Sequence, residues 1–225
     1  MADELGVGGV PVQGDAVPEA GWIAPGLREE FPGLAIRHLT LERGSGRSPR
    51  EVKARLRALS DRFGGGQAIN LRQRPIPWAY RVFYRHVGLD PDRTPTPVEQ
   101  LALDRMKHGS FRSRNLLDDA LTIAIIESGV ALRAFDADRV EGRMGIRGSV
   151  PGERLEGRAT DLPTGTLVIA DERRPLAMLF GATGEGRGVT SKTRRTLVCA
   201  VQVKGVPDIA VEEAVWLVSA VMGST

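Results

Sequence analysis

The stretch Asn115–Gly142, NLLDDALTIAIIESGVALRAFDADRVEG, decides the fold that this sequence predicts. Asn115 is a preferred residue for the N-terminal cap of a helix, and apolar residues recur after it at helical spacing. Because they cover more than one side of that helix, we expect the helix to be central and buried. Gly129 is a typical left-handed terminator. The run ALRAFD that follows, residues 131–136, is typical of a strand and carries a single cation, Arg133.

Helical patterns come mostly before this stretch and strand patterns mostly after it. Capping boxes at Ser48 and Thr96 predict the starts of two helices, and another helical pattern surrounds Trp78. Short apolar runs separated by glycines predict several strands over residues 144–203, in addition to an earlier strand over residues 34–41. Helices followed by strands predict an α+β fold rather than an alternating α/β one.

Length and composition bound the kind of protein. The chain has 225 residues, 41% of them hydrophobic and 26% charged, which is typical of a soluble globular protein. Residues 1–20 lack periodicity and predict a flexible tail, so we expect residues 21–225 to form a single domain. The only cysteine, Cys199, excludes an internal disulfide framework and suits a reducing cytoplasm. No apolar run is long enough for a membrane helix, and the acidic N-terminus does not resemble a signal peptide.

The loop Gly181–Gly188, GATGEGRG, is the second informative stretch. Its glycines allow close backbone approach, as phosphate-binding loops require, but the spacing fits neither a nucleotide P-loop nor a dinucleotide fingerprint. A tight turn explains the glycines equally well. Glu185 is the anomaly, because a carboxylate among exposed N–H groups can accept a substrate hydroxyl or amine. No cysteine and histidine spacing predicts a metal site, and no cofactor is predicted.

Four separated segments resemble the editing module of bacterial phenylalanyl-tRNA synthetase, formed by the third and fourth domains of its beta subunit. Free-standing relatives of that module also occur. The segments are NLLDDALTIAI with LRAFDADRVEG, the run LVIADERRPLAMLFG, the run GEGRGVTSKTRRTLV, and the Trp78, Tyr80, Arg81 helix with its GLDP turn. The resemblance covers roughly residues 78–203. It implies an α+β fold with mixed or antiparallel sheets packed as a sandwich, and a pocket that hydrolyses mischarged tyrosyl-tRNA.

Only some of the family's site residues are present at the matching positions of this sequence. Glu185 falls on the glutamate that recognises the tyrosine hydroxyl in the family. Arg133 stands in place of the family's pocket histidine, and Leu121 stands in place of its helix asparagine. The resemblance implies catalytic roles for Arg133 and Glu185. It implies substrate contacts by a set of residues from the central helix, the strand and the glycine loop: Leu121, Arg133, Phe135, Gly184, Glu185 and Gly186.

The replacement of histidine by arginine changes the expected chemistry. Arg133 is a permanent planar cation, which can bind a carboxylate or a terminal phosphate but cannot act as a general base. An aminoacyl ester is already reactive, so that a positioned water, a stabilised oxyanion and the substrate's own ribose hydroxyl can suffice. Three cations just before the central helix, Lys107, Arg112 and Arg114, are candidates for contact with RNA phosphates. The net charge of +3 and the sequence pI of about 9.4 permit such contact.

Three functions remain open on the sequence. The first is an aminoacyl-tRNA deacylase acting in trans on mischarged tRNA, in the cytoplasm and without a membrane. The second is a non-catalytic module that binds aminoacyl-tRNA. The third is a module that binds an amino acid and has no RNA partner. The sequence leaves open whether an aminoacyl-tRNA synthetase recruits the chain, and it leaves the oligomeric state open.

Overall fold

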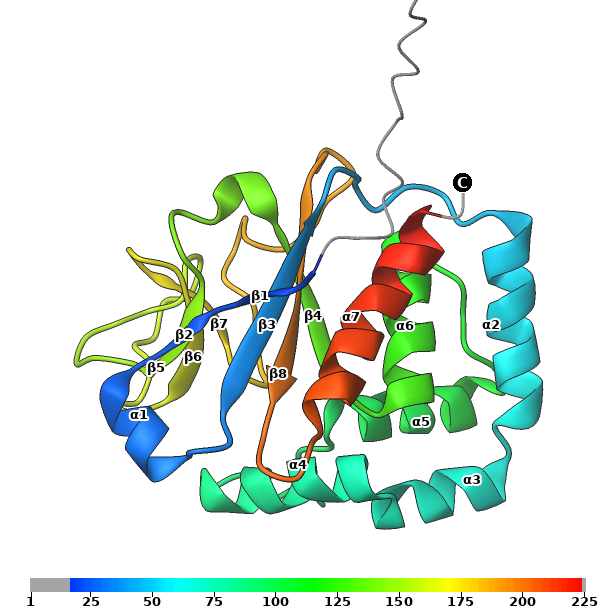
Figure 1. Ribbon diagram of the computed structural model, residues 1–225, viewed down its shortest axis with the longest axis horizontal. Helices are drawn as coiled ribbons and strands as arrows, with labels where there is room; N and C mark the ends of the chain where they lie inside the picture. Colours follow the sequence, from blue (N-terminus) through cyan, green and yellow to red (C-terminus); the bar gives the residue numbers. More distant parts are fainter. Residues whose placement is uncertain (1–16, 224–225) are drawn as a thin grey trace, which may run out of the picture.

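The computed structural model describes residues 17–223, which form two four-stranded sheets and a set of helices (Figure 1). The helices, including two short 3-10 turns, are α1 (Pro25–Glu30), α2 (Arg50–Arg62), α3 (Gly65–Asn70), η1 (Leu71–Gln73), α4 (Pro75–His86), α5 (Pro97–His108), α6 (Leu116–Ser128), η2 (Ala137–Arg139) and α7 (Asp208–Gly223). The strands are β1 (Glu19–Ala20), β2 (Trp22–Ile23), β3 (Ala35–Leu41), β4 (Ala131–Asp136), β5 (Gly145–Gly148), β6 (Leu167–Ala170), β7 (Pro175–Met178) and β8 (Thr196–Gln202). The predicted α+β class is confirmed.

The two sheets differ in strand direction. The first sheet has the order β1-β3-β8-β4 and is antiparallel throughout. The second has the order β2-β5-β6-β7, in which β2 runs parallel to β5 and the other pairs are antiparallel. Helices α6 and α7 cover one side of the first sheet, and the second sheet lies on its other side (Figure 1). The first sheet is therefore the middle layer, and β4 forms its edge.

Helix α6 is central, as the sequence predicts. The Asn115 side chain accepts a hydrogen bond from the Asp118 backbone N–H at 2.9 Å, which caps the helix. Helix α6 contacts α2, α5, α7 and β4. Eight of its residues are buried: Leu116, Leu117, Asp119, Ala120, Ile123, Ala124, Ile125 and Ile126. Such burial on several sides leaves this helix little freedom to move, so it is a rigid support for the residues at its N-terminus.

Two predicted local features are wrong. The predicted tail lies mostly outside the described residues, but its last two residues, Glu19–Ala20, form β1 and pair with β3, so the ordered part begins before residue 21. Ser48 does not cap α2. Its hydroxyl instead donates to the buried Asp119 carboxylate at 2.6 Å, so a tertiary contact replaces the predicted local one.

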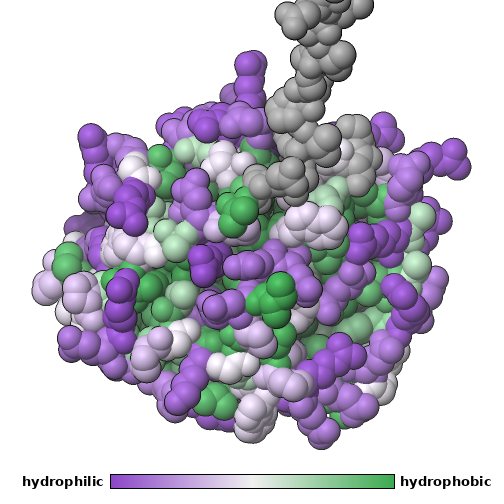
Figure 2. Space-filling model, in the orientation of Figure 1, coloured by the Kyte–Doolittle hydropathy of each residue, from purple (hydrophilic) through white to green (hydrophobic). Residues whose placement is uncertain are grey.

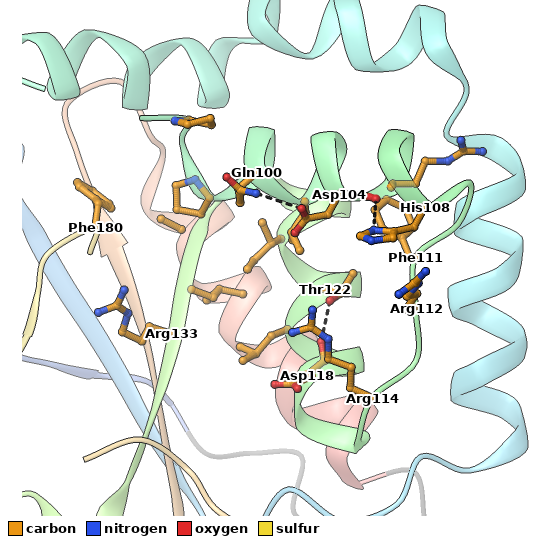
Figure 3. A pocket seen from close by; sticks show the side chains of 18 of the residues that line it. Gln100, Asp104, His108, Phe111, Arg112, Arg114, Asp118, Thr122, Arg133 and Phe180 are labelled. Atoms are coloured by element: carbon orange, nitrogen blue, oxygen red, sulfur yellow. Dashed lines mark hydrogen bonds between the residues drawn. The ribbon is translucent and has the colours of Figure 1, made fainter. Parts of the chain in front are cut away.

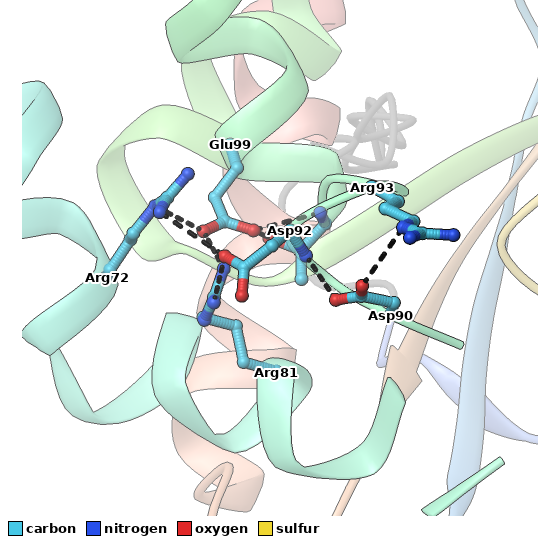
Figure 4. Close-up of polar contacts among 7 residues, drawn as sticks. Arg72, Arg81, Asp90, Asp92, Arg93 and Glu99 are labelled. Atoms are coloured by element: carbon cyan, nitrogen blue, oxygen red, sulfur yellow. Dashed lines mark hydrogen bonds and ion pairs between the residues drawn. The ribbon is translucent and has the colours of Figure 1, made fainter. Parts of the chain in front are cut away.

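A buried ion-pair network joins α4 to the start of α5 (Figure 4). Arg81 donates to Glu99 at 2.7 Å and to Asp92 at 2.6 Å, and Arg72 adds a contact to Glu99 at 3.2 Å. Glu99 also completes the predicted capping box, because its carboxylate accepts from the Thr96 backbone N–H at 3.0 Å. Arg81 lowers the pKa of the exposed Asp92 carboxyl below its usual range.

Gly129 ends α6 in the left-handed conformation, with φ of +78°. A Cβ built there would lie 3.1 Å from Pro77, which is tighter than ordinary contact. We therefore expect Gly129→Ala to lower the free energy of unfolding by about 1–2 kcal/mol, the cost of a left-handed alanine, plus a contact term. Gly109→Ala is the matched control, since Gly109 ends α5 with φ of +77° and open space around it. Equal losses in urea unfolding would show that Pro77 yields without cost.

Within residues 17–223, no helix is long and apolar enough to cross a bilayer. On the face shown in Figure 2, hydrophobic residues lie interspersed among hydrophilic ones. Scattered exposed hydrophobic residues are ordinary for a protein surface and carry no functional argument here.

Candidate functional site

A pocket of about 870 Å³ lies between α5, α6 and the edge strand β4 (Figure 3). This volume falls in the range of small-molecule sites. One part of its wall is apolar: Leu101, Leu121, Ile125, Leu132, Leu179 and Phe180. The charged residues on its wall are four arginines and two aspartates: Arg105, Arg112, Arg114, Arg133, Asp104 and Asp118. The pocket can therefore take a ligand with an apolar part, and its excess of cations favours anionic groups.

Arg133 and Phe180 lie at one end of the pocket, and Arg112 and His108 lie at the other (Figure 3). Arg133 extends from β4 toward the turn after β7. Its guanidinium donates from Nη1 to the Met178 carbonyl at 3.1 Å and from Nη2 to the Gly181 carbonyl at 2.6 Å. Arg133 thus connects the edge of the first sheet to the second sheet. Its Nε–H and the second hydrogens of Nη1 and Nη2 have no protein acceptor within residues 17–223.

The surroundings of Arg133 withdraw its charge from water. Burial lowers the pKa of the Arg133 guanidinium from its ordinary value. Burial also raises the pKa of the neighbouring Cys199 thiol to about 12 and raises the pKa of the Tyr84 hydroxyl. Both neighbours are therefore neutral near pH 7. No carboxylate of the described residues forms an ion pair with Arg133.

The N-terminus of α6 holds the opposite end of the pocket in place. The buried Asp119 carboxylate accepts from the Arg114 backbone N–H at 3.0 Å and from the Ser113 hydroxyl at 2.6 Å. These bonds fix the backbone from which Arg114 projects. The side chains of Arg112 and Arg114 are exposed and pair with no acid among the described residues. They are free to meet an external anion.

The structure brings together part of the predicted site. Leu121, Arg133, Arg112 and Arg114 all line this pocket. Lys107 is exposed on α5 but lies outside the pocket wall, next to His108, which is part of that wall. The contact predicted for Phe135 is wrong in this structure: Phe135 is 0% exposed and belongs to the core, because its side chain points from β4 between the layers.

The structure does not bring the glycine loop into this pocket at Glu185 or its two neighbours. Glu185 is exposed and lies against the loop at residues 156–157: its N–H donates to the Glu156 carbonyl at 2.8 Å. A Cβ built on Gly157 would be 2.2 Å from the Glu185 carboxylate, so that Gly157 is needed for this close approach. Gly184 is buried and Gly186 is exposed, and neither lines the pocket. Only Gly181, through its carbonyl bond to Arg133, connects the loop to the site.

Sequence reasoning missed Tyr84 and Asp119. Tyr84 lines the pocket beside Arg133 and is only 1% exposed. Nothing in the local sequence relates this residue of α4 to β4. Asp119 was missed for a similar reason. Its three hydrogen-bond donors come from residues 48, 113 and 114, and only the last two are close to it in the sequence. The charge of Asp119 inside an apolar helix was the one signal available.

Comparisons with known proteins place this chain in a family. Residues 79–210 match the B3/4 domain family, which is more than half of the chain. The phenylalanine–tRNA ligase beta subunit of Yersinia pestis is 36% identical over 100 residues, which are 42% of this chain and 12% of that protein. The beta subunits of Idiomarina loihiensis and Xanthomonas campestris are each 34% identical, over 110 and 114 residues. These matches cover 48% and 49% of this chain.

The chain spans only a small part of these relatives, since each match covers 14% or less of the beta subunit's length. The match includes α5, α6, β4 and the glycine loop, and all residues that line the pocket lie within it. The chain belongs to the B3/4 domain family and is a relative of the B3/4 module of the phenylalanine–tRNA ligase beta subunit.

Proposed function

We propose that this protein is an aminoacyl-tRNA deacylase that acts in trans on mischarged tRNA. The observation that carries the proposal is the pocket between α5, α6 and β4, which combines an apolar wall with unpaired cations at both ends. The aminoacyl group would enter beside Leu121 and reach toward Arg133. The phosphates of the tRNA end would meet Arg112 and Arg114, outside the apolar part.

The reaction is the hydrolysis of an ester bond. Water attacks the carbonyl carbon, the bond to the ribose oxygen breaks, and that oxygen takes up a proton as the free amino acid leaves. A pocket that holds the ester and a water molecule together supplies much of the rate through orientation. The neighbouring ribose hydroxyl of the substrate can assist the proton transfer, so that the mechanism needs no protein base.

The test is release of free amino acid from a panel of aminoacyl-tRNAs, tyrosyl-tRNA(Phe) included, by the wild-type protein. Release of one amino acid above the spontaneous rate supports the proposal. Binding of aminoacyl-tRNA without release from any member would overturn the deacylase and leave a binding module. Glu185→Ala tests whether this pocket is the site of hydrolysis. Because Glu185 lies outside the pocket, we expect the variant to release amino acid at the wild-type rate.

Reversing the charges at the mouth should weaken RNA binding. We expect Arg112→Glu/Arg114→Glu to lower the slope of log K against log salt by about 1.4, from about 0.7 for each lost phosphate contact on a single-stranded end. The measurement is a filter-binding or anisotropy titration of tRNA at several salt concentrations.

Arg28→Glu/Arg158→Glu is the matched control for this change. Both arginines are exposed and lie outside the pocket wall. Their replacement by glutamate changes the net charge by the same amount as the double substitution at Arg112 and Arg114. A salt slope that falls equally in both double variants would show that the total charge, rather than the pocket mouth, determines RNA binding.

A further inference from the structure

Arg133 is a half-buried cation for which the described chain supplies no acid. Its two hydrogen-bond acceptors are backbone carbonyls, those of Met178 and Gly181. Removing a charge from water is costly unless a counter-charge compensates it. Carbonyl dipoles satisfy two of the five N–H groups of a guanidinium, and they leave its net charge uncompensated. This end of the pocket therefore has the electrostatics of an anion site.

The groups that face Arg133 are neutral. Cys199 lies opposite it on β8, where the two residues are register partners, and burial keeps the thiol protonated. Tyr84 approaches from α4, and its pKa is also raised by burial. A protonated phenol is a hydrogen-bond donor, so it adds to the attraction for an anion rather than competing with it.

The Tyr84 hydroxyl is itself unpaired. It forms no hydrogen bond with any residue of the described range, although the Tyr84 side chain is almost fully buried. Its oxygen is not among the side-chain atoms that are sealed from solvent without a partner, and Tyr84 belongs to the pocket wall. Tyr84 and Arg133 line the same pocket and are near enough to interact electrostatically, so a hydroxyl donor and a guanidinium are available there to one carboxylate.

We propose that Tyr84 and Arg133 bind the side-chain carboxylate of an aspartyl or glutamyl group, which makes acidic aminoacyl esters the substrate class of this pocket. The inference deepens the proposed function and rests on it for the ester. In an aminoacyl ester the α-carboxyl is consumed by the bond to ribose. The only carboxylate that such a substrate can offer to Tyr84 and Arg133 is therefore the one in its side chain.

A carboxylate could also come from a free amino acid, and three ligands separate the two sources in the wild-type protein. Isoglutamine keeps the side-chain carboxylate and has an amide in place of the α-carboxylate. Glutamine keeps only the α-carboxylate, and glutamate has both. We expect isoglutamine to bind about tenfold or more tightly than glutamine, in line with a charge-assisted hydrogen bond, as measured by titration calorimetry. Equal binding, tighter binding of glutamine, or no binding of isoglutamine would each overturn the proposal.

Variants locate the site. Arg133→Gln removes the charge and should abolish the preference for isoglutamine over glutamine. Arg133→Lys keeps the charge without the planar fork and should retain part of the preference. Tyr84→Phe should reduce isoglutamine binding about fivefold or more by removing one donor. Arg158→Gln, an exposed cation outside the pocket wall, is the control and should bind as the wild type does. An unchanged preference in Arg133→Gln would place the carboxylate elsewhere.

The outcome is separable from that of the proposed function. Hydrolysis of esters with neutral side chains, at rates equal to those of glutamyl-tRNA or aspartyl-tRNA, would overturn the inference and leave the deacylase standing. Tight isoglutamine binding without hydrolysis of any ester would overturn the deacylase and leave the carboxylate site at Tyr84 and Arg133 standing. Because the preference is measured between two ligands on one protein, a loss of stability in the Arg133 variants does not imitate it.

Discussion

Replacing Glu99 with alanine is expected to lower the free energy of unfolding by about 3–5 kcal/mol, the cost of leaving a buried partner charge uncompensated. The Glu99 side chain is 4% exposed and that of Arg81 is 5% exposed. Glu99 is the buried acid that faces Arg81, whereas the other acid, Asp92, is exposed. The Nε of Arg81 already lacks an acceptor, so the loss of Glu99 leaves a desolvated guanidinium held by Asp92 alone.

The same network predicts an asymmetry between its two buried members. Arg81→Met should cost less than Glu99→Ala, because Glu99 would keep its contact with Arg72 at 3.2 Å and its hydrogen bonds with Thr96. Urea unfolding of both variants, followed by circular dichroism, measures the difference. Asp92→Asn is the control at the exposed end and should lose less than either. An equal loss in Glu99→Ala and Asp92→Asn would contradict the view that burial sets the cost.

This network also gives a structural role to one of the segments that resemble the synthetase module. The tryptophan–tyrosine–arginine helix and the turn GLDP form one of the segments that carry the resemblance. In the structure Tyr80 is buried, and its hydroxyl accepts from the Ala131 N–H at 3.1 Å, while Arg81 holds α4 to the start of α5. These residues position β4 and α5, the two elements on either side of the pocket. The segment could be recognised from the sequence, but its structural role could not, because the partners of Tyr80 and Arg81 lie elsewhere in the chain.

Local capping chemistry was predictable only where the partner is local. Thr96 and Glu99 form their capping box as the spacing predicts. Asn115 and Gly129 likewise begin and end α6. Ser48 has the same sequence signature as Thr96, yet its hydroxyl bonds to a carboxylate 71 residues away. A charged acceptor in a buried position competes successfully with a backbone cap, and the sequence gives no measure of that distance.

The same difference between local and distant neighbours separates the site residues that could be predicted from those that could not. Leu121, Arg112 and Arg114 lie on or next to α6, and Arg133 lies on the strand after it, so that one continuous segment predicts four members of the pocket wall. Glu185 lies on a separate loop and was placed with them by the resemblance, as Leu121 was, but the structure places Glu185 against Gly157 instead. Which side of a loop a carboxylate faces depends on the loop packed beside it. No periodicity in the sequence reports that neighbour.

Asp119→Ala should affect both stability and function, because this carboxylate connects the core to the mouth of the pocket. Asp119 is 1% exposed and accepts from Ser48, Ser113 and the Arg114 N–H. Hydrogen bonds to a buried charged group contribute about 1.5–3 kcal/mol, so we expect a loss of about 2–3 kcal/mol in the free energy of unfolding. The Ser48 hydroxyl, 5% exposed, is the donor least able to find water instead.

The functional effect follows from the same bonds. Without Asp119 the backbone at Arg114 loses its anchor to α6, and the cation no longer has a fixed position for a phosphate. We therefore expect the salt slope of tRNA binding to fall in Asp119→Ala, at a temperature where the variant is folded. Ser48→Ala is the control: it removes one donor from the same carboxylate but leaves the bonds at residues 113 and 114. A salt slope that falls equally in both variants would mean that general loosening weakens RNA binding. A slope that stays unchanged in Asp119→Ala would mean that Arg114 needs no anchor.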